Sequence, residues 1–215
     1  MTYLDVVNNI LKRLREQTVS TVDATPYSKL IGILVNDSKA DIQNAWKWSA
    51  LRTSLVAVTS NGTFGYAMDE AKTNFEVLNV VNDTENTVLR YIPQNEMSEK
   101  LNLRDLVYGS PQYYSFNGTN LDGDSIIEFY PIPDDVYNIN IDIVERTGDY
   151  TSDTDVVLLP EQPLILLAYA KAVEERGEDG GGSSNRAFAN AERSISDHIA
   201  LDANRHPEEL IWAQV

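Results

Sequence analysis

The residues best suited to chemistry are acidic and lie around one predicted strand. Asp122 and Asp124 precede the segment 125–130, which contains Glu128, and two further acids follow it at 134–135. Two carboxyl groups at a fixed separation across a cleft hydrolyse glycosides, and six or more oxygens bind calcium. The spacing fixes neither arrangement, and Asp-Gly and Asn-Gly pairs are common in turns. We therefore interpret these acids as turn residues.

Other catalytic and metal-binding residues are scarce. The absence of cysteine excludes disulfides, thiolate zinc sites, iron–sulfur clusters and cysteine nucleophiles. His198 and His206 do not have the i, i+4 spacing of a helical zinc site. The glycines at 180–182 lack the Lys-Ser/Thr ending of a phosphate-binding loop, and no Gly-x-Ser-x-Gly motif is present. The sequence predicts no catalytic residue, no metal site and no cofactor.

The charge balance argues against recognition of nucleic acid. Lys and Arg total 17 against 33 for Asp and Glu, which gives a formal net charge of −16. Most of such a surface repels a phosphate backbone. The one basic cluster, at 12–15, coincides with apolar residues at helical spacing, so it is interpreted as the solvated side of an amphipathic helix.

Neither a membrane span nor a secretion signal is predicted. The longest apolar stretch, 164–170, is far shorter than the roughly 20 residues that a spanning helix needs. The first residues lack the basic and then apolar layout of a signal peptide. We expect the protein to be cytoplasmic where it is made.

Helices are predicted where apolar residues recur at spacings of three and four. Thr2 and Asp5 have capping-box spacing, and Thr25-Pro26 is typical of an N-cap followed by a first-turn proline. The composition of 177–185 predicts a flexible joint. Of the two tryptophans at 46 and 48, we expect one in the core and the other over the first strand. The four expected helices span 2–17, 26–48, 161–177 and 186–202.

Strands are predicted between the second and third helices. In the clearest one, Tyr137, Ile139, Ile141 and Ile143 alternate with polar residues, which indicates a strand with one face in water. The segments are bounded by Gly, Pro, Asn or Asp. The expected strands span 52–59, 63–68, 75–81, 88–92, 112–116, 125–130 and 136–145, with a short helix within 93–103.

This order of elements predicts an α+β fold: a helical bundle with an inserted antiparallel β-sheet or sandwich module and a flexible C-terminal arm. We assign 1–50 and 160–205 to the bundle, 51–159 to the β module and 206–215 to the arm. The arm follows a proline and carries large apolar residues, which favours burial against a partner. It docks either on its own bundle or, as we prefer, on another subunit.

Several segments resemble the head-to-tail adaptor proteins of short-tailed, podovirus-like bacteriophages. They are 41–52 (DIQNAWKWSALR), 75–83 (FEVLNVVND), 174–181 (EERGEDGG), 197–202 (DHIALD) and 204–209 (NRHPEE). Together with the helix, sheet, helix order and the acidic balance, the resemblance extends over nearly the whole chain.

The resemblance implies a structural protein of the virion neck or tail, made in the host bacterial cytoplasm. Such adaptors form a ring of twelve copies between the portal protein and the tail nozzle protein, and DNA passes through it without sequence-specific binding. The helices line the channel, the β module lies outside, and attachment of tail fibres varies among members. The C-terminal segment reaches the portal, which here implies a portal-binding arm containing Pro207, Leu210, Ile211, Trp212 and Val215.

Two other functions stay open from the residues alone. One is a virion accessory module whose β portion binds a carbohydrate or another tail or fibre protein. The other is a carboxylate-based glycan hydrolase. We favour the non-enzymatic adaptor, because a ring of twelve such chains sums to roughly −200 formal charges and an acidic bore does not grip DNA.

Overall fold

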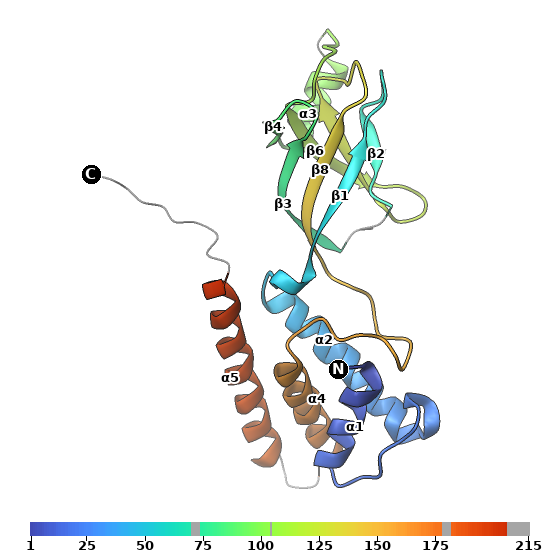
Figure 1. The fold of residues 1–215 in the computed structure, drawn as a ribbon, viewed down its shortest axis with the longest axis vertical. Helices are drawn as coiled ribbons and strands as arrows, with labels where there is room; N and C mark the ends of the chain where they lie inside the picture. The colour runs from blue at the N-terminus through green and yellow to red at the C-terminus, as the bar shows by residue number, and fades with distance from the viewer. Residues whose placement is uncertain (70–73, 104, 178–181, 206–215) are drawn as a thin grey trace, which may run out of the picture. The chain divides into compact units, whose positions relative to one another are not determined.

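The computed structural model describes residues 1–69, 74–103, 105–177 and 182–205, and shows two compact units (Figure 1). One unit contains residues 1–51 together with those from 146 onward, and the other contains 52–145. The first is helical and the second is built of strands with one helix. This confirms the predicted α+β fold, in which a β module is inserted into a helical bundle.

The helical unit is organised around α4, which packs against α1, α2 and α5. The α1 and α2 helices also contact each other, and the short 3₁₀ helices η1 and η2 lie in the connections that follow α1 and α2. The bounds are Tyr3–Arg13 for α1, Val22–Ala24 for η1, Pro26–Ala45 for α2, Ser49–Leu51 for η2, Glu161–Arg176 for α4 and Gly182–Arg205 for α5.

The predicted starts of α1 and α2 and the predicted stop of α4 are confirmed, whereas α1 ends at Arg13, before the expected end at 15–17. The Thr2 hydroxyl accepts from the Asp5 backbone N–H, and the Asp5 carboxylate accepts from the Thr2 N–H. Thr25 and Ser28 form the same reciprocal pair before Pro26. Gly177 ends α4 with a φ of 62°, a left-handed conformation that costs glycine little.

The α1 and α2 helices approach closely at Gly32. A Cβ atom built there lies 2.4 Å from Tyr3 Oη and 2.8 Å from a Val22 methyl carbon, so only glycine fits. Around this contact the unit has a continuous apolar core, as the predicted periodicities require. Its fully buried aliphatic residues include Val6, Val7, Ile10, Ile31, Val35, Ile42 and Leu164.

The two tryptophans that follow α2 have different surroundings. Trp48 is 2% exposed, and its indole N–H donates to the Ile42 carbonyl at 2.7 Å, which confirms the core assignment. Trp46 is half-buried and contacts α5. Its indole N–H donates to Asp202 of α5 at 3.1 Å, and the same carboxylate accepts from the backbone N–H and hydroxyl of Ser49. This carboxylate joins the C-terminal part of α5 to the chain after α2.

The start of α5 differs from the prediction. Residues 182–185, assigned to the flexible joint, form its first turn, and residues 178–181 lie outside the described part of the chain. Ser184 is 6% exposed in this turn, and α5 packs along α4. Tertiary packing therefore outweighs the low helix propensity of Gly and Ser.

The β module consists of two sheets. The first is antiparallel throughout, with the order β1-β8-β3-β4, and the second has the order β2-β7-β6-β5 with a parallel pair, β5 and β6. The short helix predicted after Pro93 is present as α3, Gln94–Asn102. The strand bounds are Arg52–Val58 for β1, Gly65–Ala67 for β2, Phe75–Asn82 for β3, Thr87–Val88 for β4, Arg90–Tyr91 for β5, Tyr113–Thr119 for β6, Ser125–Tyr130 for β7 and Asn138–Glu145 for β8.

A single apolar core joins the two sheets. Ile139, Ile141 and Ile143 of β8 point into it, and the polar residues between them lie on the other face, so the predicted alternation is confirmed. The second sheet contributes Ile127 and Phe129. The module is therefore a β-sandwich.

The segment 88–92, predicted as one strand, is divided between the two sheets. Leu89 is 4% exposed and belongs to the sandwich core. Its backbone N–H donates to Val80 of the first sheet, whereas the next N–H, of Arg90, donates to Gln112 beside the second. A buried side chain at the crossing point thus separates β4 from β5.

The segment 146–159, assigned from sequence to the β module, belongs to the helical unit. Backbone N–H groups of Tyr3 and Leu4 donate to carbonyls of Asp155 and Asp153 at 2.9 and 3.2 Å. The side chain of Asn36 on α2 exchanges two hydrogen bonds with the backbone of Tyr150. These contacts place the boundary between the units at 145/146.

Candidate functional site

The residues of the expected portal-binding arm, Pro207, Leu210, Ile211, Trp212 and Val215, lie outside the described part of the chain. The structure describes α5 up to Arg205, so the arm follows a helix of 24 residues. The remaining candidate residues lie in the β module and in the helical unit.

The acids at 122 and 124 are turn residues, as predicted. The side-chain oxygen of Asn120 accepts from the backbone N–H groups of Asp122 and Asp124 at 2.9 and 2.8 Å. The Asn120 amide in turn donates to the Asp124 carboxylate at 2.9 Å. Gly123 has a φ of 87°, which suits a tight turn. The Asn120 side chain and the Asp124 carboxylate therefore organise the β6–β7 turn.

Glu128 has a different environment, because it is buried within β7. It is 4% exposed, and its two carboxylate oxygens accept from the side-chain amides of Asn117 at 2.7 Å and Gln94 at 3.0 Å. The Gln94 carbonyl oxygen accepts from the Ser115 hydroxyl at 2.8 Å. Sequence reasoning identified Glu128 but missed Gln94, which only the packing of α3 on this sheet brings near it.

Asp134 forms a hydrogen bond with a tyrosine of the sandwich. The Tyr137 hydroxyl donates to the Asp134 carboxylate at 2.7 Å. This hydrogen bond is the main reason that the pKa of Tyr137 is raised to about 12, with burial and neighbouring acids adding to it. The acid therefore serves a structural contact next to β8.

This shift predicts a loss of stability at alkaline pH. Below about pH 10 Tyr137 is protonated in both states, but between about pH 10 and 12 only the unfolded state releases its proton, which favours unfolding. We measure the free energy of unfolding in urea at about pH 8 and at about pH 11. We expect this free energy to fall less between the two pH values for Tyr137→Phe than for the wild type. The exposed Tyr108 supplies the control, since Tyr108→Phe is expected to lose as much as the wild type. If all three proteins lose the same stability, the raised pKa of Tyr137 does not contribute to the alkaline loss and the prediction is wrong.

Several described acids of the β module take part in hydrogen bonds of the fold. In residues 1–69, 74–103, 105–177 and 182–205 no group of three or more His, Asp and Glu side chains could hold a metal ion. Asp124, Glu128 and Asp134 each accept a hydrogen bond from a side chain of the fold. Their observed contacts stabilise turns and strands of the module.

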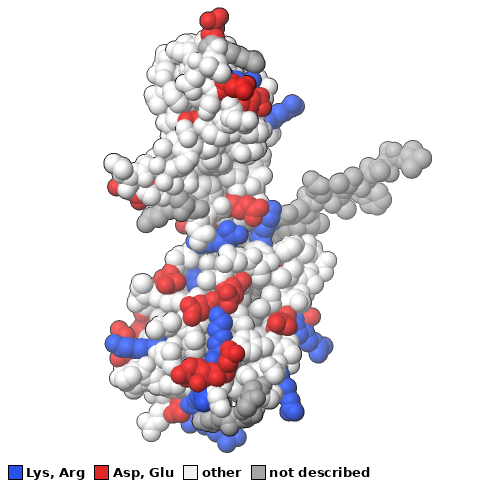
Figure 2. All heavy atoms as spheres, turned by 180° about the vertical axis from the view of Figure 1, so that it is seen from behind, with Lys and Arg blue, Asp and Glu red and all other residues white. Residues whose placement is uncertain are grey.

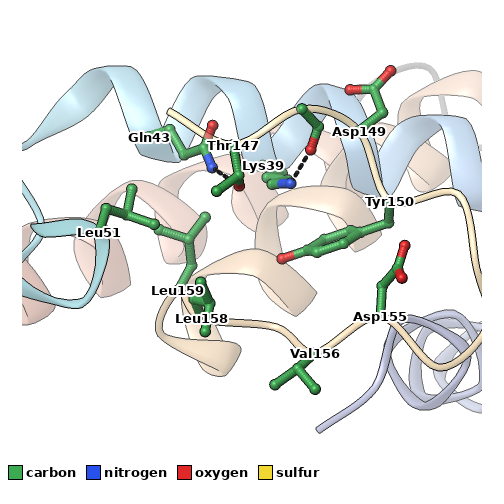
Figure 3. A pocket seen from close by; sticks show the side chains of 11 residues that line it. Lys39, Gln43, Leu51, Thr147, Asp149, Tyr150, Asp155, Val156, Leu158 and Leu159 are labelled. Carbon is green, nitrogen blue, oxygen red and sulfur yellow. Dashed lines mark hydrogen bonds between the residues drawn. The ribbon is translucent and has the colours of Figure 1, made fainter. Parts of the chain in front are cut away.

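The helical unit contains a cavity of about 250 Å³ around a buried lysine (Figure 3). Lys39 of α2 is 3% exposed, donates to the Gly148 carbonyl, and lies 3.9 Å from the ring centroid of Tyr150. Beside it, the Gln43 amide donates to the Thr147 hydroxyl at 2.9 Å. Both contacts join α2 to the segment that returns from the β module.

Burial lowers the pKa of Lys39, while the charges of Asp149 and Asp155 oppose this change. The ammonium group is stabilised by a carbonyl and by the face of an aromatic ring, as expected for a cation removed from water. We interpret the cluster as a clamp that holds 147–150 on α2. The spacing in the sequence indicates that Lys39 is buried, because it lies four positions after Val35 and three before Ile42, on the apolar face of the helix.

A sequence model described as SU10 adaptor protein matches residues 1–209, which include both units. The chain belongs to this family. It is therefore a bacteriophage adaptor protein, a structural component placed at the virion neck. No curated protein sequence matches the chain.

For a member of the SU10 adaptor family, the surface is the functional part. Lys12 and Arg13 are exposed on the last turn of α1, as expected for the solvated side of that helix, whereas the exposed Arg15 lies beyond the helix end with a φ of 61°. On the face seen in Figure 2, acidic and basic side chains are interspersed over the helical unit, while the visible face of the β module carries few charges. No helix among the described residues has the length and apolar character needed to cross a bilayer.

Large apolar side chains are also exposed on the β module. Val56 and Val58 lie on the same face of β1, an edge strand, and are 59% and 56% exposed. Leu106, Val107 and Tyr108 are each about half exposed after α3. Contiguous apolar patches mark surfaces that contact other proteins, so these two short runs are candidates for such contacts.

Proposed function

We propose that the protein forms a ring of twelve copies between the portal and the tail nozzle, through which the genome passes. The main support is the family match, which extends from the first residue through both units to residue 209. The apolar residues of the arm that follows α5 add a means of attachment. In this assembly the helical units face the channel and the β modules face outward.

A non-enzymatic function agrees with the chemistry of the chain. The buried carboxylates of the β module serve turns and strand contacts, and the buried lysine of the helical unit serves as a clamp. DNA meets a protein with a net charge of −16, so the conduit does not hold the phosphate backbone. Passage without sequence-specific binding follows from this charge.

The proposal is tested by imaging the purified protein with its portal. We expect negative-stain electron microscopy to show a twelve-fold ring attached to one end of the portal, and native mass measurement to give twelve adaptor copies per complex. A protein that stays monomeric with the portal, or a ring of another order, contradicts the proposal.

Ring formation is expected to depend on ionic strength. Adjacent subunits of net charge −16 repel each other, and moderate salt reduces the range of this repulsion to about 8 to 10 Å. We therefore expect the fraction of rings, measured by sedimentation velocity, to rise from low salt to physiological ionic strength. Rings that form best without salt and dissociate near physiological strength indicate attractive charge pairs at the interface and contradict the argument.

A further inference from the structure

The outer face of the second sheet has a hollow that the proposed function does not use. Along β7, Ile127 and Phe129 point into the sandwich core, so Glu128 lies on the opposite face. One end of this face is covered by α3, whose Met97 packs against Tyr130. The remainder lines a cavity of about 450 Å³, and Glu128 lies in its wall.

Within the part of the chain that the structure describes, Glu128 has no cationic partner. Each of its oxygens accepts from one neutral amide, of Asn117 and of Gln94, and none of the described lysines or arginines forms an ion pair with it. An ionised carboxylate has about four acceptor positions, so both oxygens retain capacity for further donors. A buried charge without an opposite charge is costly, and the two amides compensate only part of that cost.

The walls of the cavity suit a long side chain with a planar end. Gly65 pairs with Glu128 across β2 and β7 and contributes no side chain to the cavity wall; a Cβ built there lies no closer than 3.6 Å to Ile126 and 4.0 Å to the Cγ of Glu128. Ile126 and Phe64 supply apolar surface, and Phe64 is 38% exposed. A guanidinium group both pairs with carboxylates through two parallel hydrogen bonds and stacks on aromatic rings.

We propose that this cavity binds an arginine side chain presented by another protein of the virion. The guanidinium donates to the free positions of the Glu128 carboxylate, and the apolar stem lies along Ile126 and Phe64. The ammonium of lysine is a weaker candidate, because it neither forms the two parallel bonds nor stacks in the same way. This site is independent of the ring and of the arm, so it can fail while the proposed function stands.

The test uses the full chain and a small probe, Nα-acetyl-L-arginine methylamide, followed by ¹H–¹⁵N nuclear magnetic resonance. The matched control is the corresponding citrulline compound, which has nearly the same shape and no charge. We expect the arginine probe to shift the backbone signals of Gly65 and Ile126 and the side-chain amide of Asn117. The citrulline compound should bind with an affinity at least about ten-fold lower, because the charge-assisted hydrogen bonds are lost.

Three variants locate the binding. Glu128→Gln removes the charge and Gly65→Leu fills the cavity, and both should weaken the arginine probe by about ten-fold or more. Asp122→Asn removes an exposed charge from the same module and should change the affinity by less than about two-fold. Gly65→Leu keeps the test decisive if Glu128→Gln alters the fold.

The proposal is overturned if the wild type does not respond to the arginine probe, or if citrulline binds equally well. Equal binding to Gly65→Leu places the contact elsewhere and overturns it too. A neutral oligosaccharide that shifts these signals, while arginine does not, shows that the cavity recognises sugar hydroxyls instead.

Discussion

Deletion of residues 208–215 is expected to abolish attachment to the portal while the midpoint of thermal unfolding stays nearly unchanged. The deleted segment contains Leu210, Ile211 and Trp212, and each large apolar side chain contributes about 1.5 to 3 kcal/mol when fully buried. Twelve copies of the arm multiply this contribution at the portal. The helical unit keeps its described contacts, including the bonds of Asp202 to Trp46 and Ser49.

Co-sedimentation with the portal and thermal unfolding of the same preparations measure both halves of this prediction. Replacing the three apolar residues 210–212 by serine should have the same effect as the deletion. Replacing Glu208 and Glu209 by glutamine is the matched control, and should leave portal attachment intact. A large fall in the unfolding temperature after deletion means that the arm docks on its own bundle. Survival of attachment means that the portal contact lies elsewhere.

Replacing Trp48 by alanine is expected to destabilise the helical unit by about 3 to 5 kcal/mol, the usual cost of removing a large aromatic side chain from a core. Trp48 is 2% exposed, and the change also leaves the Ile42 carbonyl without its indole donor. Urea unfolding followed by far-ultraviolet circular dichroism, which reports mainly the helices, measures the loss.

Trp46→Ala is the matched control, because Trp46 is only half-buried and its main polar contact is the single bond to Asp202. We expect it to cost clearly less than Trp48→Ala. Equal costs for the two variants contradict the assignment of Trp48 as the core residue. A Trp48→Ala protein of unchanged stability contradicts it as well.

The two predictions separate the parts of an adaptor. Loss of the arm should remove attachment without unfolding the protein, whereas loss of Trp48 should reduce the amount of folded helical unit and affect every interaction together. Comparing portal binding per folded molecule for the two variants distinguishes these effects. The arm deletion lowers that ratio, and Trp48→Ala leaves it unchanged.

Much of the fold was predictable from local sequence. Capping residues and proline set the starts of α1 and α2, because they satisfy or remove donors that a helix start leaves free. Alternating isoleucines set the inward face of β8, because successive strand residues point to opposite faces. The order of helices, strands and helices, together with family-like segments, also led to the adaptor family.

Tertiary structure alone decided the features that depend on distant partners. Leu89 divides a predicted strand because its side chain enters the core between two sheets, and the first turn of α5 forms because it packs on α4. The segment 146–159 joins the helical unit through hydrogen bonds to α1 and α2. The buried carboxylate of Glu128 gains the Gln94 amide as a donor only when α3 packs on the second sheet. Periodicity and capping describe neighbours within one turn or strand, whereas these contacts join residues tens of positions apart, whose pairing depends on the packing of the whole unit.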